Sequence, residues 1–338
     1  MALRRTLLRP VLVLTVVARS AGTYGGARYG GGRGGYGGAS RGRGSRGRGR
    51  SAPVYRPAFD DMTEGSSESG EMQPDEQLDQ LYGVSPVLSA LRSRRRELRR
   101  LWLQDTLSTD KRSDRPALRE IETLAHEAGL PVGRRDKGTL NGMCRNRPHQ
   151  GLVLEAEPLS YVPLEALPPL AEASDPAPAP LWLALDEVTD PQNLGALLRS
   201  ALFLGVDGVL VSAKNTCSLT PAVSKASAGA MELSPVHSAR NLPRTLEAAR
   251  EAGWQIVGAA LERSIEPSEL DQSVPTVLVL GSEGAGLRTN VLRACSSLVR
   301  IPRGATALDD AELVDSLNVS VAGGILLYTL MSQRRAST

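Results

Sequence analysis

Three short polar side chains stand where the last apolar segment of the chain begins. Ser316, Asn318 and Ser320 precede the run GGILLYTL. Such side chains bond to nearby backbone and therefore favour helix caps and turns over helix interiors. The cluster can cap a helix that starts near Asn318, or it can form a loop whose polar groups face a ligand. Both interpretations stay open on these residues alone.

Other polar residues directly follow apolar runs earlier in the chain. The run LWLAL at 181–185 leads into DPQNLG, which contains Asn193, and the run TVLVL at 276–280 leads into GSEGAGL, which contains Glu283. Continuous apolar runs between amphipathic helical patterns predict parallel strands that are covered on both faces. Because ligands bind such sheets outside the carboxyl ends of the strands, these loops and the 316–320 cluster predict one binding site.

The motifs exclude several kinds of chemistry. The phosphate-binding pattern GxxxxGK[ST] is absent, GSEGAG fits the dinucleotide pattern GxGxxG only loosely, and no cluster has metal-ligand spacing, so no metal is expected. Of the three His, only His237 falls in this part of the chain, which leaves no Ser–His–Asp set. What remains is glycine backbone that can approach a flat ligand, with the polar side chains of Asn193, Arg199, Glu283 and Asn318. Such a site can bind and orient a substrate without an acid–base pair.

The elements that must carry these residues alternate over 181–335. We predict strands at LWLALDEV, GVLVS, WQIVGAAL, TVLVLG and VRIP, and helices at NLGALLRSALFLG, LPRTLEAAREAG and 318–333. Gly205 marks the end of the first helix. The predicted fold class is therefore α/β with a mostly parallel sheet.

Residues 78–157 predict a smaller α/β module. The stretch 81–102 has mostly helical spacing with a block of arginines. A strand-like LWL, a helix over 116–128, a basic loop RRDKGTLNGMCRNRPHQ and a strand GLVLEAEP follow. Two basic stretches in one module favour an RNA partner, although a basic face is often only a solvated face. The predicted RNA contacts are Arg95, Arg96, Arg99, Arg134 and Arg135. Residues 158–180, rich in Pro and Ala, are expected to be a linker.

The N-terminal part differs in composition. No Asp or Glu precedes Asp60, whereas twelve Arg do. Residues 1–22 mix Arg with apolar residues, which is typical of a mitochondrial transit peptide, although VLVLTVVA also suits a secretory signal. Residues 23–77, Gly/Arg-rich and then acidic, predict disorder, as a spacer or a weak RNA-binding segment. Three scattered Cys and no apolar run of membrane-spanning length predict neither a disulfide framework nor a membrane span.

Three stretches, in order, carry a family resemblance. DPQNLGALLRSALFLGVDGVLV, LVLGSEGAGL, and IPRG followed by SLNVSVAGGILLY resemble the three motifs of the SpoU-type RNA ribose methyltransferases of the SPOUT superfamily. The match covers roughly 181–333, and the module before it is similar to the ribosomal-protein-like substrate-binding domain of that family. The resemblance implies a C-terminal trefoil knot, S-adenosylmethionine as cofactor and a homodimer.

The resemblance also implies a reaction and its residues. A methyl group would pass to the ribose 2'-hydroxyl of a guanosine in large-subunit rRNA. The reaction would take place in the mitochondrial matrix if residues 1–22 are a transit peptide. By motif position, the cofactor would be held by Gly281, Ile301 and Leu317. The reacting ribose would be faced by Arg199, Glu283, Asn318 and Asn193.

Two points stay open. Family proposals give the hydroxyl proton to Arg199, but a guanidinium is effectively always protonated, so this side chain would rather clamp a phosphate and stabilise the developing alkoxide. The chain also departs from the family by an acidic insertion near 308–315, which would be a lid or a partner contact. A protein that keeps the fold as an inactive RNA-binding assembly factor is the alternative function.

Overall fold

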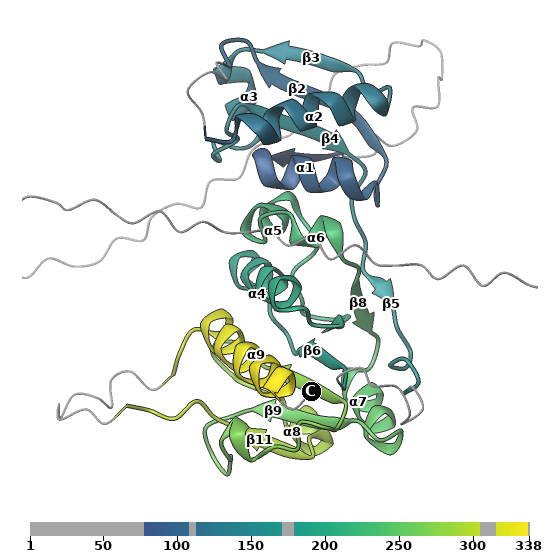
Figure 1. Cartoon of the computed structure of the whole chain (residues 1–338), viewed down its shortest axis with the longest axis vertical. Coiled ribbons are helices and arrows are strands. Elements are labelled where there is room, and N and C mark those ends of the chain that lie inside the picture. The colour runs from purple at the N-terminus through teal and green to yellow at the C-terminus, as the bar shows by residue number, and fades with distance from the viewer. Residues whose placement is uncertain (1–77, 108–112, 171–178, 305–315, 337–338) are drawn as a thin grey trace, which may run out of the picture. The chain divides into compact units, whose positions relative to one another are not determined.

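The computed structural model describes residues 78–107, 113–170, 179–304 and 316–336. The predictions for residues 1–77 and for the acidic insertion lie outside these ranges. The described chain is built around two sheets, one of four strands and one of seven. Figure 1 shows their arrangement. No helix within the described ranges is long and apolar enough to cross a membrane.

The small sheet is mixed. Its strands, in spatial order, are β1 (Asp79–Tyr82), β4 (Leu152–Ala156), β2 (Leu98–Gln104) and β3 (Val132–Arg135). Strand β4 is antiparallel to both of its neighbours, and β2 is parallel to β3. Helices α1 (Val84–Ser93) and α2 (Arg115–Glu127) pack on one face of the sheet, and α3 (Lys137–Met143) packs on the other.

Part of the helical prediction for 81–102 is wrong. Only 84–93 is helical, because Arg94 adopts the left-handed conformation (φ 49°) as C-cap and the chain then pairs with β4 as a strand. The arginines after Arg94 therefore lie on a turn and a strand. The predicted helix at 116–128 is confirmed as α2, whereas the predicted basic loop contains β3 and α3.

The large sheet is parallel at every described pairing, which confirms the predicted class. Its strands, in spatial order, are β11 (Ser297–Val299), β9 (Gln255–Ala259), β10 (Thr276–Leu280), β6 (Leu181–Leu185), β7 (Gly208–Ser212), β8 (Val236–Ala239) and β5 (Val162–Pro163). The predicted VRIP strand lies earlier, at 297–299. The trefoil knot stays a prediction, because the path between Gly304 and Ser316 is outside the described residues.

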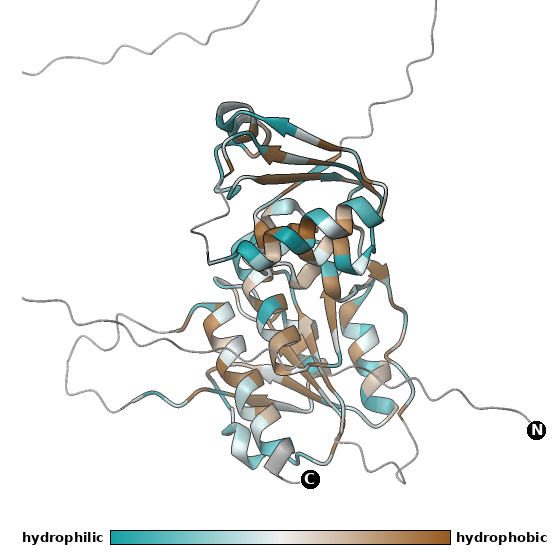
Figure 2. Cartoon of the chain, turned by 45° about the horizontal axis from the view of Figure 1, so that its top comes forward, coloured by the Kyte–Doolittle hydropathy of each residue, from teal (hydrophilic) through white to brown (hydrophobic). Residues whose placement is uncertain are grey.

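Helices cover both faces of this sheet. One face packs against α4 (Pro191–Leu204), α5 (Pro221–Ala226), α6 (Ala230–Leu233) and α9 (Val319–Ala336). The other packs against α7 (Leu242–Glu251) and α8 (Thr289–Ala294). Figure 2 shows brown, hydrophobic stretches along the strands. The predicted stop of α4 is confirmed, since Gly205 adopts the left-handed conformation with φ 82°.

Strand β6 shows how the two faces are filled. Leu181, Leu183 and Leu185 belong to the α4/α9 core, and Trp182 and Ala184 belong to the α7/α8 core. All five are buried, as the apolar run predicted. Burying one Leu side chain stabilises a fold by about 1.5–3 kcal/mol, so this central strand anchors both layers.

Sequence analysis missed several short elements. These are β5, β8, α5, α6, α8 and the 3-10 turn η1 (Pro267–Glu269). The segment expected to be a linker is partly integrated in the fold. Its strand β5 pairs with β8, and Leu164, Leu167 and Leu170 pack on the α7/α8 core.

Candidate active site

The strand ends bring three of the predicted site residues together. In register, Leu280 of β10 pairs with Leu185 of β6, so the loops after these strands leave the sheet side by side. Asn193 lies in the first turn of α4 after β6, and Glu283 lies just after β10. Asn318 reaches the same place from the start of α9.

These three side chains form one hydrogen-bonded network. The amide nitrogen Nδ2 of Asn193 donates to Oε2 of Glu283 at 3.1 Å. The Nδ2 of Asn318 donates to Oε1 of Glu283 at 3.0 Å and to Oδ1 of Asn193 at 2.9 Å. Asn193 is buried and Glu283 is exposed, so a fixed carboxylate faces outward from a buried amide.

Helix caps hold the two asparagines in place. Asp190 caps α4, since its Oδ2 accepts from the backbone N–H of Asn193 at 3.0 Å. Asn318 caps α9, since its Oδ1 accepts from the N–H of Ser320 at 2.9 Å and from its hydroxyl at 2.6 Å. The cap interpretation of the 316–320 cluster is therefore confirmed, because the side-chain oxygen of Asn318 caps the helix. Its amide nitrogen joins the polar network, and the ligand-loop interpretation stays a prediction.

Next to the network lies a cavity of about 950 Å³. Its lining includes all three predicted cofactor residues, Gly281, Ile301 and Leu317, together with Glu283. Leu261 and Leu317 also line it and are 57% and 47% exposed. Exposed apolar side chains on a concave wall suit the flat face of a nucleoside-sized ligand, and the volume is in the usual range for such sites. The residues present therefore fit an adenosyl cofactor.

Gly281 lines the cavity, but a glycine is required there because the backbone of the same turn lies against it. A Cβ atom there would lie 2.1 Å from the carbonyl carbon of Gly286 and 2.4 Å from the nitrogen of Leu287. The turn closes back on itself, because Ser282 and Gly286 exchange backbone hydrogen bonds at 3.1 and 3.0 Å. Only glycine permits this close approach, so Gly281 shapes the turn that carries Glu283.

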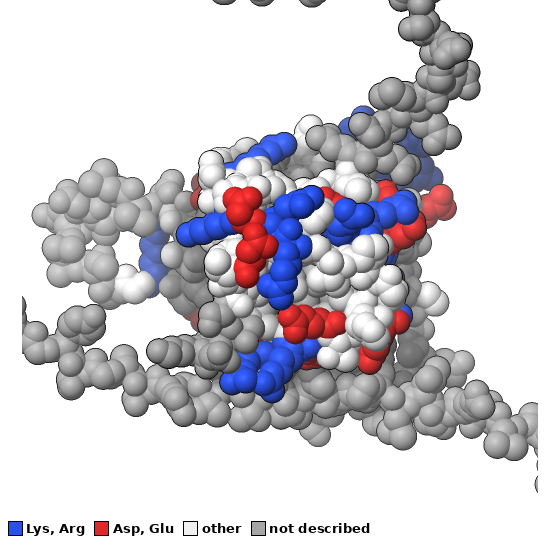
Figure 3. All heavy atoms as spheres, turned by 90° about the horizontal axis from the view of Figure 1, so that it is seen from above, with Lys and Arg blue, Asp and Glu red and all other residues white. Residues whose placement is uncertain are grey.

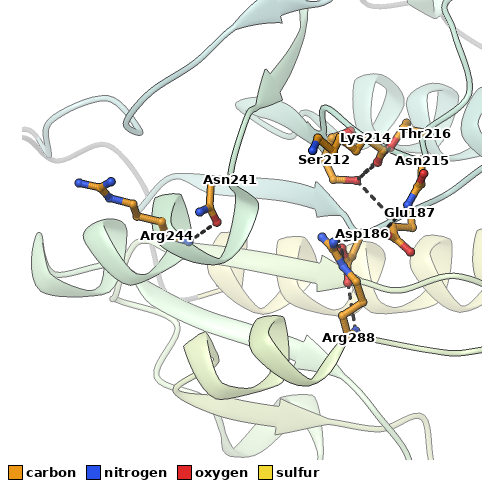
Figure 4. A network of polar contacts seen from close by, with 9 residues as sticks. All are labelled: Asp186, Glu187, Ser212, Lys214, Asn215, Thr216, Asn241, Arg244 and Arg288. Atoms are coloured by element: carbon orange, nitrogen blue, oxygen red, sulfur yellow. Dashed lines mark hydrogen bonds and ion pairs between the residues drawn. The ribbon is translucent and has the colours of Figure 1, made fainter.

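A second network, which sequence analysis missed, fixes the other end of that turn (Figure 4). Asp186 is fully buried, and its Oδ1 accepts from Nε and Nη2 of Arg288 at 2.9 and 2.6 Å. Its Oδ2 accepts from the backbone N–H of Arg288 at 3.1 Å. Arg288 also pairs with Glu187 at 3.0 Å. The hydrogen bond to Asp186 raises the pKa of Arg288 above its ordinary value.

The same network extends to the end of β7. The backbone N–H of Glu187 donates to Oγ of Ser212 at 3.2 Å, and Nδ2 of Asn215 donates to Oε1 of Glu187 at 3.0 Å. Glu187 and Asn215 both adopt positive φ, at 59° and 54°. No sequence motif predicted this network, although an Asp at the end of an apolar run was a visible signal.

Arg199 is not part of the polar network. It is exposed on α4, six residues or about 9 Å of helix beyond Asn193. No hydrogen bond or ion pair to it occurs within the described ranges. It shares an exposed side of α4 with Leu202 and Phe203, which are 41% and 80% exposed. The catalytic role of Arg199 stays a prediction.

One of the predicted RNA contacts, Arg96, is wrong, and another, Arg95, is half-buried and stays a prediction. The side chain of Arg96 is 1% exposed and bonds to Asp79 at 2.7 Å and to Glu232 at 3.0 Å, so it cannot reach RNA. Arg95 donates to the backbone carbonyls of Met231 and Ser234 at 2.9 and 2.6 Å. The arginine run misled because a charged run normally predicts exposure, whereas these two guanidinium groups satisfy buried or half-buried acceptors.

The other predicted RNA contacts remain exposed. Arg99 is paired with Glu97 at 2.9 Å and Glu157 at 2.6 Å. Arg134 donates to the carbonyl of Asp105 at 3.4 Å, and Arg135 lies over the ring of Trp102. Of these three arginines, only Arg99 has an acidic partner in the described structure.

Ligands of parallel α/β sheets bind outside the carboxyl ends of the strands, and this cavity lies there, next to the end of β10. The sequence model of the SpoU rRNA Methylase family matches residues 180–328, and that of the RNA 2'-O ribose methyltransferase substrate-binding domain matches residues 80–162. The chain belongs to the SpoU rRNA methylase family.

Individual relatives and a solved structure are similar to this chain over most of its length. The chain is 39% identical to human "rRNA methyltransferase 1, mitochondrial" over 78% of this chain and 76% of that protein. It is 38% identical to the Pseudomonas aeruginosa "23S rRNA (guanosine-2'-O-)-methyltransferase RlmB" over 76% of this chain and 98% of that protein. A solved AdoMet-bound rRNA methyltransferase from Sinorhizobium meliloti matches with TM-score 0.58 and 25% identity, over 76% of this chain and 87% of that chain.

Proposed function

We propose that this protein transfers a methyl group from S-adenosylmethionine to the ribose 2'-hydroxyl of a guanosine in mitochondrial large-subunit rRNA. The observation that carries the proposal is the Asn193–Glu283–Asn318 network, whose Glu283 lines the same cavity as Gly281, Ile301 and Leu317. The names of the relatives from human and Pseudomonas aeruginosa support the substrate.

Such a sparse site suits this reaction. The bound cofactor supplies a sulfonium methyl group that is already activated, so the chain mainly has to hold and align the acceptor. Alignment of this kind supplies about 7–11 kcal/mol. Ile301 and Leu317 would hold the adenosyl group, and the carboxylate of Glu283 would accept a hydrogen bond from the ribose. Each Glu283 oxygen accepts one amide N–H in the network and keeps capacity for a further donor.

Arg199 would act at the rim of this site. As a permanent cation it would clamp a phosphate of the target and stabilise the developing alkoxide, rather than take the proton. It shares its side of α4 with exposed apolar residues, and α9 adds Val321, Ile325 and Tyr328, which are 49%, 40% and 63% exposed. A homodimer formed through this surface would cover these side chains and bring Arg199 close to the subunit contact.

The remaining regions complete the proposal. Residues 78–157 would bind the RNA, 181–335 would carry the cofactor in a knotted fold, and 1–22 would direct the protein to the matrix. The mitochondrial names of the human, Dictyostelium discoideum and Schizosaccharomyces pombe relatives support the mitochondrion as destination. Microscopy of a fusion with the first 60 residues tests it, and a cytosolic or secreted signal would refute the transit peptide.

One experiment tests the reaction. The purified full chain is incubated with a large-subunit rRNA transcript and S-adenosylmethionine labelled in the methyl group, and 2'-O-methylation is mapped by its resistance to alkaline cleavage. We expect one methylated guanosine. A folded protein that binds the cofactor and the RNA without transfer would instead be the inactive assembly factor, and the proposed activity would be wrong.

A further inference from the structure

The small domain carries two groups of arginines that differ in their partners. In the first, which we call the paired arginines, Arg92, Arg96 and Arg99 each contact at least one carboxylate within 3.0 Å. In the second, which we call the stacked arginines, Arg100 and Arg135 lie over the ring of Trp102. Neither stacked arginine has an acidic partner within the described ranges.

The strand register places the stacked arginines on one face of the sheet. Arg100 and Trp102 are two residues apart on β2, and Trp102 pairs with Gly133 of β3, while Gln104 pairs with Arg135. Side chains two apart on a strand point to the same face. The guanidinium carbons of Arg100 and Arg135 therefore lie 5.0 and 4.3 Å from the centroid of the indole ring.

The indole is a fixed support. Trp102 is only 8% exposed and packs with Tyr82, Leu140, Cys144 and Val153. It also lies across Gly133, where a Cβ atom would come within 2.3 Å of the ring. Its Nε1 is buried without a hydrogen-bond partner in the described structure, so the ring is held by packing. A fixed ring restricts both guanidinium groups, which removes part of the ordering that a ligand would otherwise impose.

The neighbouring carboxylates do not form ion pairs with the two stacked arginines among the described residues. Glu155 is the acidic residue opposite Arg100 in the strand register, but no ion pair joins them among the described residues. Asp136, next to Arg135, uses its carboxylate to cap α3 by accepting from the N–H of Thr139 at 3.1 Å. Figure 3 views the molecule from above, looking onto the small domain. Blue Lys and Arg side chains spread over this surface, with red Asp and Glu side chains between them.

We propose that Arg100 and Arg135, held by Trp102, form a preorganised site for phosphate groups of the substrate RNA. This inference rests on the proposed function, because it names residues that bind the rRNA substrate of that reaction. A guanidinium stacked on an aromatic ring still presents its N–H edge, which matches the oxygens of a phosphate. The match of residues 80–162 to a substrate-binding domain of RNA ribose methyltransferases favours RNA over an acidic protein.

Two double variants with the same change in charge test the site. In Arg100→Gln/Arg135→Gln the stacked arginines are removed. In the control, Arg92→Gln/Arg119→Gln, two exposed arginines are removed from α1 and α2, which cover the other face of the sheet. Binding of a large-subunit rRNA transcript to the full chain is measured across salt concentrations. Each lost phosphate contact flattens the slope of log affinity against log salt by about 0.7–0.9. We expect the stacked variant to flatten it by about 1–2 and the control variant to leave it nearly unchanged.

A conservative variant tests the stacking itself. Arg100→Lys/Arg135→Lys keeps both charges but loses the planar groups that lie on Trp102. We expect the salt slope to stay near the wild-type value while affinity falls by about threefold to tenfold at each salt concentration. Wild-type affinity in this variant would overturn the preorganised site, and so would equal slopes in the two Gln variants when both are folded by circular dichroism.

Methyl transfer separates this inference from the proposed function. If the wild type methylates rRNA while the stacked Gln variant binds RNA with wild-type affinity and salt slope, the phosphate site is wrong and the enzyme stands. If the wild type binds RNA in the arginine-dependent way but never transfers a methyl group, the phosphate site stands and the proposed activity is wrong.

Discussion

Two polar networks lie at the carboxyl ends of the same parallel strands, and they use their hydrogen bonds differently. In the first, Asn193 and Asn318 each donate one amide N–H to exposed Glu283, whose oxygens can still accept more. In the second, Arg288 makes three hydrogen bonds to fully buried Asp186. A network that keeps free acceptors at a cavity can bind substrate, whereas one in which an arginine closes on a buried carboxylate braces the fold.

Both networks act on one turn, from Gly281 to Arg288. The second network fixes its far end to β6, and the first uses Glu283 near its start. The comparison therefore predicts that variants of the bracing network change stability and cofactor affinity. Variants of the open network should change methyl transfer at nearly constant stability. Four substitutions separate these effects.

Gly281→Val should have the largest effect, because it removes the turn on which both networks depend. Its side chain would overlap the backbone of Gly286 and Leu287. We expect cofactor binding, measured by calorimetry, to be lost and the melting temperature to fall. Gly284→Ala is the control, since nothing lies within 4 Å of a Cβ atom there. Wild-type cofactor affinity in Gly281→Val would mean that the turn is not part of the site.

Glu283→Gln should lower the rate of methyl transfer by about 10²-fold, because a small misplacement of the reacting groups costs that much. A Gln amide presents a donor where an Asn amide also donates, so the network cannot close as it does with Glu283. Single-turnover transfer and cofactor calorimetry measure the two effects separately. We expect cofactor affinity to stay within about tenfold. Equal losses in both would make Glu283 a binding residue only.

Arg288→Ala should mainly destabilise the fold. It leaves the buried carboxylate of Asp186 without its cation and with the backbone N–H of residue 288 as its remaining donor from that position, which costs on the order of 3 kcal/mol. Denaturant unfolding measures this loss, and Arg293→Ala is a control on an exposed arginine of α8. If Arg288→Ala is as stable as the control but slower in transfer, the bracing role is wrong.

Asn318→Ser should have the smallest effect on stability. Serine is a good N-cap, so the start of α9 should keep its unfolding free energy within about 1 kcal/mol. The amide donor to Asn193 and Glu283 is lost, so the rate of transfer should still fall. A loss of stability without a loss of rate would show that Asn318 is only a cap.

The sequence predicted the open network better than the closed one. Asn193, Glu283 and Asn318 each sit in a motif loop after an apolar run, and parallel strands bring such loops together. Asp186 and Arg288 are 102 positions apart, and nothing in either local pattern indicates that they pair. The position of Arg199 outside the network also could not be predicted, because spacing along a helix does not show what lies opposite each side.

In the small domain too, the sequence did not indicate which charged side chains pair with each other. The sequence indicated which segments are basic, but not which cations meet carboxylates. Arg96 is buried against Glu232, which is 136 positions away, while Arg100 remains without an acidic partner in the described structure. Such pairings depend on tertiary contacts. The run of arginines therefore predicted exposed side chains, whereas Arg96 forms a buried ion pair with Glu232.

The most direct test of the account is a double-mutant cycle on Asn193 and Asn318 in single-turnover methyl transfer to large-subunit rRNA. Residues that act as one unit are strongly non-additive. We predict that Asn193→Ala, Asn318→Ala and the double variant lose transfer to a similar extent while each still binds cofactor. Folded variants that transfer at near wild-type rate, or losses that simply multiply in the double variant, would contradict a single catalytic network at this site.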